Sequence, residues 1–238
     1  MSKGKLYLIP TTLGDNNPLE VLPISVKQVI ENTSHFIVEN EKSARRFIKK
    51  IAPEKKQSEL VIYLLDKRTQ EIDTQHYLDV CNNGIHVGLL SEAGVPAIAD
   101  PGATIVNLAH KKNINVKPLV GPSSILLAMM SSGFNGQNFA FNGYLPIDSK
   151  ERKRTIKTLE KLSKDKNQSQ LFIETPYRND KMVVDLLQTL SPSTKLCIAA
   201  DITLKEEYIR TLEIKEWKKT AKPNLHKRPT IFIIHKMY

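Results

Sequence analysis

Small, rigid and acidic residues fill the stretch that follows one expected strand of this chain. The sequence "GLLSEAGVPAIADPG" (Gly88–Gly102) begins as a buried strand and continues into a loop with two glycines, two prolines and two carboxylates. In open α/β sheets, ligands bind beyond the carboxyl ends of the strands. Gly94 and Gly102 let a ligand approach the backbone closely, and Glu92 and Asp100 can accept hydrogen bonds from it. The stretch is a candidate ligand loop, and a tight structural turn is the alternative.

Two further loops of small residues also follow expected strands. The sequence "LIPTTLGD" (Leu8–Asp15) is a strand that runs into a glycine-containing loop, and "GPSS" (Gly121–Ser124) joins a strand to a helix. Small hydroxyl residues at a helix N-terminus offer donors to a ligand, although a plain serine cap is the alternative. No loop matches a P-loop or a dinucleotide fingerprint, so a phosphate-rich cofactor is not favoured. Because all three loops follow strands, we expect them to converge at one crevice.

Strand-like apolar runs alternate with helix-like patterns along the chain, which predicts an α/β protein with two domains. The first, residues 1–120, has a mainly parallel sheet. The second, residues 121–238, has a mixed sheet, because its last strands follow one another through short links. Strands are expected at residues 5–10, 35–39, 59–66, 86–90, 115–120, 138–146, 170–175, 195–201, 208–214 and 230–236, and helices at 24–32, 42–51, 73–83, 104–112, 123–133, 149–164 and 179–190.

The composition is that of an ordinary globular protein, with 40% hydrophobic and 25% charged residues. It contains no apolar run of about 18 residues, so we expect no membrane span. The N-terminus is not typical of a secretory signal. Cys81 and Cys197 lie far apart in apolar contexts, which favours two buried free thiols in a reducing cytoplasm. The six histidines are scattered, and no metal site is expected.

The net charge of +10 is concentrated in the second half of the chain. Residues 146–238 carry 20 Lys and Arg against 12 Asp and Glu, whereas residues 1–145 carry 15 against 13. This asymmetry suits a polyanionic partner, and it is also a common solubility device. Trp217, the single tryptophan, could stack on a base or anchor a helix to its domain. Five cations share one face of the helix expected at 149–164, which suits RNA phosphates or is a solvated surface: Lys150, Arg154, Lys157, Lys161 and Lys164.

Five segments match the motifs of one enzyme family in order and in spacing. They are "PTTLGDN" (Pro10–Asn16), "GLLSEAGVPAIADPG" (Gly88–Gly102), "PLVGPSSILLAMMSSGF" (Pro118–Phe134), "FNGYLPIDSKERKR" (Phe141–Arg154) and "FIETPYR" (Phe172–Arg178). Together they resemble the tetrapyrrole-methylase superfamily of S-adenosylmethionine-dependent methyltransferases. Within it, the chain looks most like the ribosomal RNA small-subunit methyltransferase I family, which methylates a ribose 2′-hydroxyl.

The resemblance implies a homodimer that binds S-adenosylmethionine in a cleft between two α/β domains. Two segments depart from the family pattern: its "AEDTR" reads "VENEK" (Val38–Lys42), and its "RELTKxHEE" reads "ADITLKEE" (Ala200–Glu207). The residues expected to bind RNA are Arg45, Arg46, Lys150, Arg154 and Lys157. The residues expected to bind the methyl donor are Pro10, Leu90, Ser91, Glu92, Gly94, Val95, Ser123, Ser124, Phe172, Ala200, Pro229 and Thr230.

Methyl transfer to a ribose hydroxyl benefits from a general base, because the hydroxyl is a poor nucleophile at neutral pH. Glu174, at the end of an expected strand, is the first candidate, and an ion pair with Arg178 is the alternative. Asp100 is a second candidate, with capping of the helix near Thr104 as the alternative.

Three functions stay open from the sequence. The first is a cytoplasmic methyltransferase that acts on ribosomal RNA. The second keeps the enzyme class but takes a small molecule such as a tetrapyrrole as its substrate. The third is a non-catalytic RNA-binding relative that has kept the fold. Donor binding separates the third function from the others, and salt-sensitive RNA affinity separates the first from the second.

Overall fold

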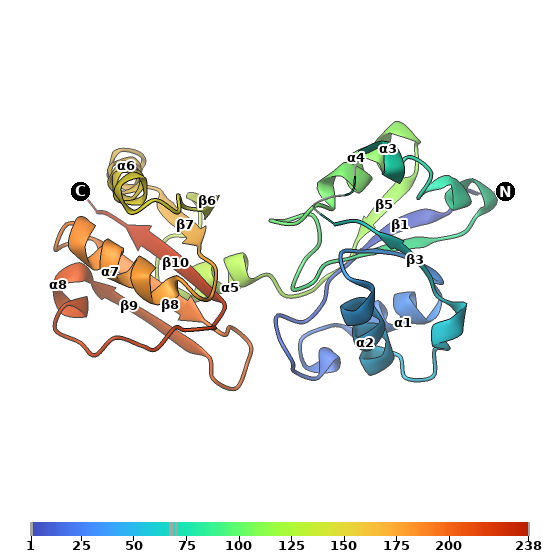
Figure 1. Ribbon diagram of the computed structural model, residues 1–238, viewed down its shortest axis with the longest axis horizontal. Helices are drawn as coiled ribbons and strands as arrows, with labels where there is room; N and C mark the ends of the chain where they lie inside the picture. Colours follow the sequence, from blue (N-terminus) through green and yellow to red (C-terminus); the bar gives the residue numbers. More distant parts are fainter. Residues whose placement is uncertain (1, 67–68, 70, 238) are drawn as a thin grey trace. The chain divides into compact units, whose positions relative to one another are not determined.

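The structure is a computed structural model that describes residues 2–66, 69 and 71–237. The chain divides into two compact units, Met1–Ser123 and Ser124–Tyr238. Each unit is a five-stranded sheet with helices packed against it (Figure 1). The boundary expected between residues 120 and 121 lies three residues before this division.

The sheet of the first unit is entirely parallel, in the strand order β3-β2-β4-β1-β5. Its central strand β4 is buried along its whole length, as expected for a strand covered on both faces. Separate apolar cores lie around Phe36 and Ile48 and around Leu89 and Ile105. The elements are β1 Lys5–Ile9, α1 Ile24–Glu31, β2 His35–Val38, α2 Glu41–Ile51, β3 Val61–Leu64, α3 Glu71–Thr74, β4 Val87–Leu90, α4 Ala103–Lys111 and β5 Asn115–Pro118.

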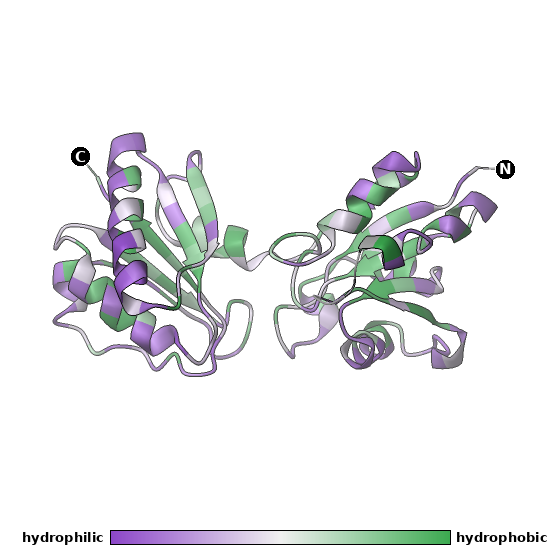
Figure 2. Cartoon of the chain, turned by 45° about the horizontal axis from the view of Figure 1, so that its top comes forward, coloured by the Kyte–Doolittle hydropathy of each residue, from purple (hydrophilic) through white to green (hydrophobic). Residues whose placement is uncertain are grey.

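The sheet of the second unit is mixed, in the strand order β6-β7-β10-β8-β9. β6 and β7 are parallel, whereas β10 is antiparallel to both β7 and β8, and β9 is antiparallel to β8. Figure 2 shows the central strands in hydrophobic colours and α6 mostly in hydrophilic ones. The elements are α5 Ser124–Ser131, β6 Phe139–Tyr144, α6 Ser149–Lys166, β7 Ser169–Ile173, α7 Asn179–Thr189, β8 Lys195–Ala200, β9 Tyr208–Glu213, α8 Ile214–Trp217 and β10 Thr230–His235.

The prediction of two α/β units, one mainly parallel and one mixed, is confirmed. The single helix expected at residues 73–83 is wrong, because only the short α3 and a 3-10 helix at Asp79–Asn83 form there. Gly84 ends that 3-10 helix with φ of 80°, a conformation that glycine adopts without strain. The tyrosine at position 77 explains the interruption, since its hydroxyl donates to the Leu64 carbonyl and its ring stacks on Tyr63. Tertiary contacts have therefore overridden the helical pattern.

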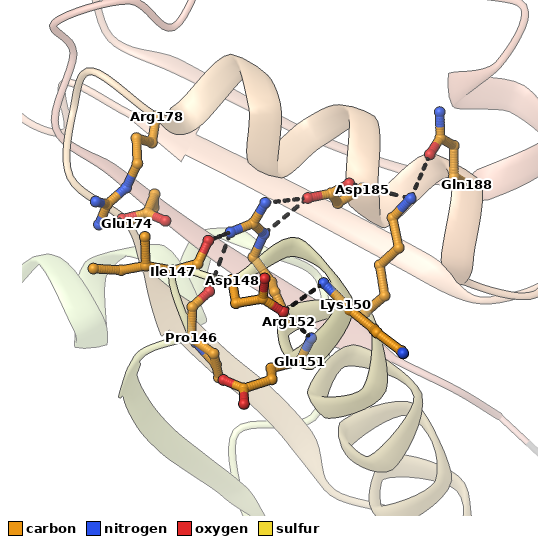
Figure 3. A network of polar contacts seen from close by, with 11 residues as sticks. Pro146, Ile147, Asp148, Lys150, Glu151, Arg152, Glu174, Arg178, Asp185 and Gln188 are labelled. Carbon is orange, nitrogen blue, oxygen red and sulfur yellow. Dashed lines mark hydrogen bonds and ion pairs between the residues drawn. The ribbon is translucent and has the colours of Figure 1, made fainter.

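A buried ion pair holds α6 against α7 in the second unit. The guanidinium of Arg152 lies 2.5 Å from Asp185 Oδ2, and the two side chains are 2% and 5% exposed. Arg152 also donates to the carbonyl oxygens of Pro146 and Ile147, so the same side chain fixes the loop between β6 and α6 (Figure 3). The basic pattern of α6 concealed this residue, although its spacing from Ile156 and Leu159 places it on the buried stripe of the helix.

Both cysteines are free and buried, which confirms the prediction made for them. Burial raises the pKa of the Cys197 thiol to about 11, with a smaller opposing effect of a hydrogen bond with Thr211. Burial also raises the pKa of Cys81. Both thiols are therefore protonated at neutral pH, which is typical of structural rather than reactive cysteines.

Replacing Arg152 tests the importance of the ion pair for the second unit. We expect Arg152→Met to lower the free energy of unfolding by about 3–5 kcal/mol, because Asp185 would be left buried without its main partner. The double substitution Arg152→Met/Asp185→Leu should be less destabilising than Arg152→Met alone. Urea unfolding followed by the fluorescence of Trp217, which is fully buried in this unit, measures the effect.

Arg154→Met is the matched control, because Arg154 lies on the same helix and is exposed. Its effect should stay within about 0.5 kcal/mol. Equal effects of the two single substitutions would contradict a structural role for the Arg152–Asp185 pair.

Candidate functional site

The three small-residue loops leave one edge of the first sheet. β1 lies between β4 and β5 and is parallel to both, so the carboxyl ends of the three strands are neighbours. The first loop (residues 10–17) follows β1, the second loop (residues 91–102) follows β4, and the third loop (residues 119–123) follows β5. The three loops therefore leave the sheet at the same edge. Open α/β sheets bind ligands at this edge, beyond the carboxyl ends of the strands.

Hydrogen bonds tie the first loop to the second. The Thr11 amide donates to the Gly94 carbonyl oxygen at 2.9 Å, and the Thr11 hydroxyl donates to the Ser91 carbonyl at 3.3 Å. The Ser91 hydroxyl also donates to the Gly94 carbonyl, at 2.5 Å. Thr11 and Ser91 are both buried, so these bonds are shielded from water. The predicted convergence of the loops is confirmed for this pair.

Two glycines allow all three loops to pack closely. Gly94 has φ of 76°, and a Cβ atom there would lie 3.0 Å from Leu13 Cδ2 and 3.1 Å from the Pro122 carbonyl oxygen. A Cβ atom at Gly121 would lie only 2.3 Å from Pro10 Cγ. The three loops therefore meet at positions where only glycine fits, and Pro10, one of the expected donor residues, is buried at this junction.

The second loop is held in a strained conformation by Asp100. Asp100 Oδ1 accepts hydrogen bonds from the amides of Ala97, at 2.6 Å, and Gly102, at 2.9 Å. Ala97 and Ala99 have φ of 66° and 61°, a region that residues with a side chain rarely adopt. Burial raises the pKa of Asp100, and its two amide partners only partly offset this effect. The alternative to catalysis, capping of the helix near Thr104, is not observed, because Asp100 bonds within its own loop, and its role as a base stays a prediction. Strain of this kind is typical of ligand-binding sites.

A pocket of about 620 Å³ lies between the first two loops and α2. Thr11, Ser91 and Glu92 line one side of it, and Arg46, Lys49 and Lys50 line the side formed by α2. Two of the cations already have partners, since Lys50 lies 2.7 Å from Asp15 and Lys49 donates to the Pro53 carbonyl. Arg46 is exposed and makes no hydrogen bond within the described part of the chain. The pocket thus carries one guanidinium group without a hydrogen-bond partner among the described residues, although Lys50 and, more weakly, the charge of Arg46 lower the pKa of Asp15.

Glu92 and Arg45, two residues expected at the site, contact α2 and its surroundings. Glu92 is exposed and accepts a hydrogen bond of 2.6 Å from the hydroxyl of Ser43, so its carboxylate links the second loop to α2. Arg45 does not line the pocket. It pairs with Glu41 at 2.7 Å and donates to the Gln57 carbonyl. Arg46 is therefore the better placed of the two adjacent arginines for contact with a ligand.

A second, apolar pocket of about 370 Å³ lies beside the second loop. Val95, Ala97 and Ile98 line it from the loop, and Leu8 and Leu119 line it from β1 and the third loop. Val95, an expected donor residue, is half-buried here. The first unit therefore offers a basic pocket and an apolar pocket, both bordered by the same loop.

Residues of the second unit expected to bind the donor cluster at one end of its sheet. Thr230 at the start of β10 is paired in register with Ala200 at the end of β8, and Ile231 is paired with Ile173 at the end of β7. Pro229 precedes β10 and is exposed. Thr230 also accepts a hydrogen bond of 3.2 Å from Asn179. The ends of β7 and β8 and the start of β10 therefore meet at one end of this sheet.

Several expected donor residues have side chains inside the apolar cores. Leu90 packs in the core beneath α1 and α2, and Phe172 and Ala200 are fully buried in the core of the second unit. Phe172 stacks on Phe232 with ring centroids 5.9 Å apart. Leu90, Phe172 and Ala200 can offer a ligand only their backbone atoms. Ser123 and Ser124, by contrast, are half-buried at the start of α5.

Glu174 makes the ion pair that the sequence offered as the alternative to catalysis. Glu174 Oε1 lies 2.6 Å from Arg178 Nη2 and accepts a further hydrogen bond from the Thr175 amide. The Glu174 side chain is 1% exposed. The hydrogen bond with Glu174 raises the pKa of Arg178. The ion pair of Glu174 therefore joins the two ends of the segment 174–178. The role of Glu174 as a general base stays a prediction.

The cations of α6 that are expected to bind RNA lie on the surface, and their contact with RNA stays a prediction. Lys150, Arg154 and Lys157 are all exposed. Trp217 is different, because it is fully buried and its indole nitrogen donates to the Leu196 carbonyl. The suggestion that Trp217 stacks on a base is wrong, and the residue anchors α8 to the sheet.

A polar cluster beside Thr230 could not be recognised from the sequence. Arg228 pairs with Asp201 at 2.5 Å and donates to the Glu206 carbonyl, while Asn179 donates to the Arg228 carbonyl at 2.7 Å. Asn179 is fully buried, and its Oδ1 atom has no partner within the described residues. These residues come from three separate segments, and no spacing along the chain indicates that they meet.

Neither a metal-binding group nor a membrane-spanning helix is present among the described residues. No group of three or more His, Cys, Asp and Glu side chains is arranged to hold a metal ion in the described part of the chain. Among the helices that the structure describes, none combines the length and apolar character needed to cross a bilayer.

Comparisons with known proteins identify the class of enzyme. A model of the family described as tetrapyrrole (corrin/porphyrin) methylases matches residues 5–217. The methyltransferase CobJ has a TM-score of 0.64 at 16% identity, covering 98% of this chain and 94% of CobJ. Uroporphyrin-III C-methyl transferase from Thermus thermophilus, complexed with S-adenyl homocysteine, has a TM-score of 0.56 at 14% identity and covers 98% of each chain. The two α/β units have the fold of these methyltransferases.

Curated relatives extend the comparison along nearly the whole chain. Proteins named ribosomal RNA small subunit methyltransferase I are 26% identical in Buchnera aphidicola (97% of this chain, 78% of the relative) and 29% identical in Thermotoga maritima (87% of each). The protein of that name from Hydrogenobaculum is 30% identical and covers 87% of this chain and 84% of the relative. The chain belongs to the tetrapyrrole methylases and is an S-adenosylmethionine-dependent methyltransferase.

Gly94 offers a direct test of the loop junction. Gly94→Ala places a Cβ atom against Pro122 and Leu13 at a positive φ, which costs about 1–2 kcal/mol in backbone strain and separates the loops. We expect the affinity for S-adenosylmethionine, measured by isothermal titration calorimetry, to fall by at least about tenfold, or ~1.4 kcal/mol.

Gly136→Ala is the matched control, because a Cβ atom there would meet no atom within 4 Å. This variant should bind the donor as the unchanged protein does. Circular dichroism should show both variants folded. Unchanged affinity in Gly94→Ala would mean that the junction of the three loops does not form the donor site.

Proposed function

We propose that this protein methylates ribosomal RNA at a ribose 2′-hydroxyl, with S-adenosylmethionine bound on the three loops of the first unit. The observation that supports RNA as the substrate most directly is the pocket of about 620 Å³, which combines the donor loops with the cations of α2. The relatives named ribosomal RNA small subunit methyltransferase I support the same substrate class.

The first unit fits the donor in both shape and chemistry. Ser91 lines the basic pocket, and the apolar pocket beside Val95 is available for an uncharged ring. S-adenosylmethionine supplies a methyl group on a sulfonium, which carries its own leaving group. The protein therefore needs mainly to position the donor and the acceptor in line. A strained loop fixed by Asp100 is suited to that role, since it is already ordered before the ligand arrives.

The lining of the basic pocket suits an RNA acceptor. In RNA, the ribose that carries the 2′-hydroxyl is flanked by phosphates. The guanidinium of Arg46 can bind one of these phosphates through two hydrogen bonds. Thr11, Ser91 and Glu92 lie on the other side of the same pocket. In the reaction, the hydroxyl oxygen forms a bond to the methyl carbon while the carbon–sulfur bond breaks, and the hydroxyl proton passes to a base or to water. Glu174 as that base, and Phe172, Ala200, Pro229 and Thr230 as donor contacts, stay predictions.

We further propose that the protein is a homodimer and acts in the cytoplasm. Leu126 and Met130 lie one turn apart on α5 and are 57% and 79% exposed. These adjoining apolar side chains are available for contact with a second chain. Light scattering coupled to size-exclusion chromatography measures the oligomeric state.

The substrate is tested by methyl transfer from tritiated S-adenosylmethionine. We expect label in ribosomal RNA, presented as small subunits or as free RNA, and a 2′-O-methylnucleoside on mass spectrometry of the digest. Label in uroporphyrinogen III instead of RNA would favour a tetrapyrrole substrate. Donor binding without transfer to either substrate would favour a non-catalytic relative.

Arg46→Met tests the pocket within the same assay. Loss of one phosphate contact should lower kcat/KM for RNA by about tenfold, or ~1.4 kcal/mol, and reduce the salt dependence of binding. Donor affinity should not change. Lys42→Met is the matched control, because Lys42 is exposed on the same helix but does not line the pocket. Equal losses in the two variants would indicate a general charge effect and contradict a specific site at Arg46.

A further inference from the structure

An ordered pair of segments lies beside the end of β7 in the second unit. The segment 174–178 follows β7, and the segment 224–229 precedes β10. The Lys227 amide donates to the Pro176 carbonyl at 3.0 Å, which joins the two segments. Lys227 has φ of 61°, an unfavourable conformation for a residue with a side chain. The Arg228–Asp201 ion pair and the hydrogen bond from Asn179 to the Arg228 carbonyl hold this turn in place.

The paired segments present an exposed tyrosine beneath a cation. Tyr177 is 70% exposed, and Lys227 Nζ lies 6.0 Å from its ring centroid, at the outer limit of a cation–π contact. The His226 ring meets Tyr177 edge-on, with centroids 5.8 Å apart. Because most of the Tyr177 ring is exposed, it contributes little to the packing of the unit. Its position is nevertheless defined by the turn that carries Lys227 and His226.

A second exposed tyrosine and an arginine continue this surface. Tyr144 ends β6, is paired in register with Ile173, and is 60% exposed. It lies close enough to Arg178 to raise the pKa of that group further, beyond the larger effect of the hydrogen bond with Glu174. We call Tyr144, Tyr177, Arg178, His226 and Lys227 the aromatic–cationic edge. Figure 3 shows Arg178 and Glu174 near the separate polar network around Arg152.

The charges around the edge favour a polyanion. Among the acids near the edge, Glu174 pairs with Arg178 and Asp201 pairs with Arg228, while Asp180 accepts a hydrogen bond from the Leu225 amide. Lys227 adds a cation without an acidic partner among the described residues. The chain from residue 146 onward has 20 Lys and Arg against 12 Asp and Glu. Lys227 lies over the Tyr177 ring and Arg178 interacts with Tyr144, so the edge is unlike the apolar centre of a protein–protein interface.

We propose that the aromatic–cationic edge binds unpaired nucleotides of the RNA substrate, with a base stacked on Tyr177 and phosphates contacted by Lys227 and Arg178. Stacking requires a base whose faces are accessible, so the edge selects single-stranded RNA over duplex. This inference rests on the proposed function, because it assumes that the substrate is RNA. It adds a requirement that the substrate segment be unpaired.

Binding of RNA without methyl donor tests the proposal separately from catalysis. The probe is a fluorescein-labelled oligouridylate of about ten nucleotides, within the usual site size of single-strand binders, compared with a duplex of the same length by fluorescence anisotropy. We expect Tyr177→Ala to weaken binding of the single strand by about tenfold, while Tyr177→Phe, which keeps the ring, changes it by less than about twofold. Duplex affinity should be the same in all three proteins.

Tyr177→Trp gives a direct readout of stacking. Because Trp217 is fully buried, a tryptophan at position 177 should dominate any emission change, and a stacked base should quench it. Lys227→Met should weaken binding of the oligouridylate and reduce its salt dependence. Lys222→Met is the matched control, since it removes the same charge from an exposed position five residues away, and its effect should be smaller.

Three outcomes would overturn the proposal: equal binding of the single strand by Tyr177→Ala and the unchanged protein, equal losses for single strand and duplex, or conversion of a dimer to a monomer by Tyr177→Ala. The last outcome would assign the edge to contact with a second copy. If Tyr177→Ala keeps methyl transfer to RNA and full oligouridylate affinity, the inference fails while the proposed function stands. If single-strand binding depends on Tyr177 but no methyl transfer to RNA occurs, the proposed function fails and the edge stands.

Discussion

The carbonyl oxygen of Gly94 joins the first two loops of the site in the first unit. It accepts from the Thr11 amide and from the Ser91 hydroxyl, so one acceptor holds the loop after β1 against the loop after β4. The close approach of Gly94 to Pro122 brings in the loop after β5. This junction exists only because β1 lies between β4 and β5 in a parallel sheet, which delivers three chain segments to one edge. Both pockets of the unit are bordered by the loop that the junction fixes.

The second unit uses a different constraint, a buried ion pair rather than a backbone junction. Arg152 is satisfied by Asp185 and by two carbonyl oxygens, so its charge is compensated although it lies out of contact with water. The insertion of β10 between β7 and β8 brings Thr230 next to Ala200 and places the segment before β10 beside the end of β7. The exposed Tyr177 and its cation depend on that strand order. Both units thus expose loop segments at the ends of their sheets.

The sequence predicted the elements well where periodicity was strong and local. The buried strand at Val87–Leu90 and the helix at Asn179–Thr189 form as expected. Gly94 and Gly121 stand where the loops pack too closely for a side chain. The helix expected at 73–83 failed because Tyr77 bonds to a distant strand end, a contact that no local pattern encodes. Arg152 was hidden among exposed cations. Its spacing from Ile156 could have indicated burial, but its partner Asp185 is on another helix.

The site was predictable as a set of loops but not as a set of contacts. Motif resemblance indicated Ser91, Gly94 and Val95, and the structure brings them together with Thr11 and Pro10. It could not indicate that Arg45 turns away to Glu41 while Arg46 lines the pocket, because adjacent helical residues differ only in the direction of their side chains. The cluster of Asn179, Asp201 and Arg228 combines three distant segments, and only the fold relates them.

The most direct test of this account is a crystal structure of the protein with S-adenosylhomocysteine, the product that remains after methyl transfer. We expect the ligand to lie against the backbone of residues 91–95, with the loop after β1 unmoved and the Thr11–Gly94 hydrogen bond intact. Density for the ligand elsewhere on the protein, or a ligand that binds only after this hydrogen bond has broken, would contradict the claim that the junction of the three loops is a preformed donor site.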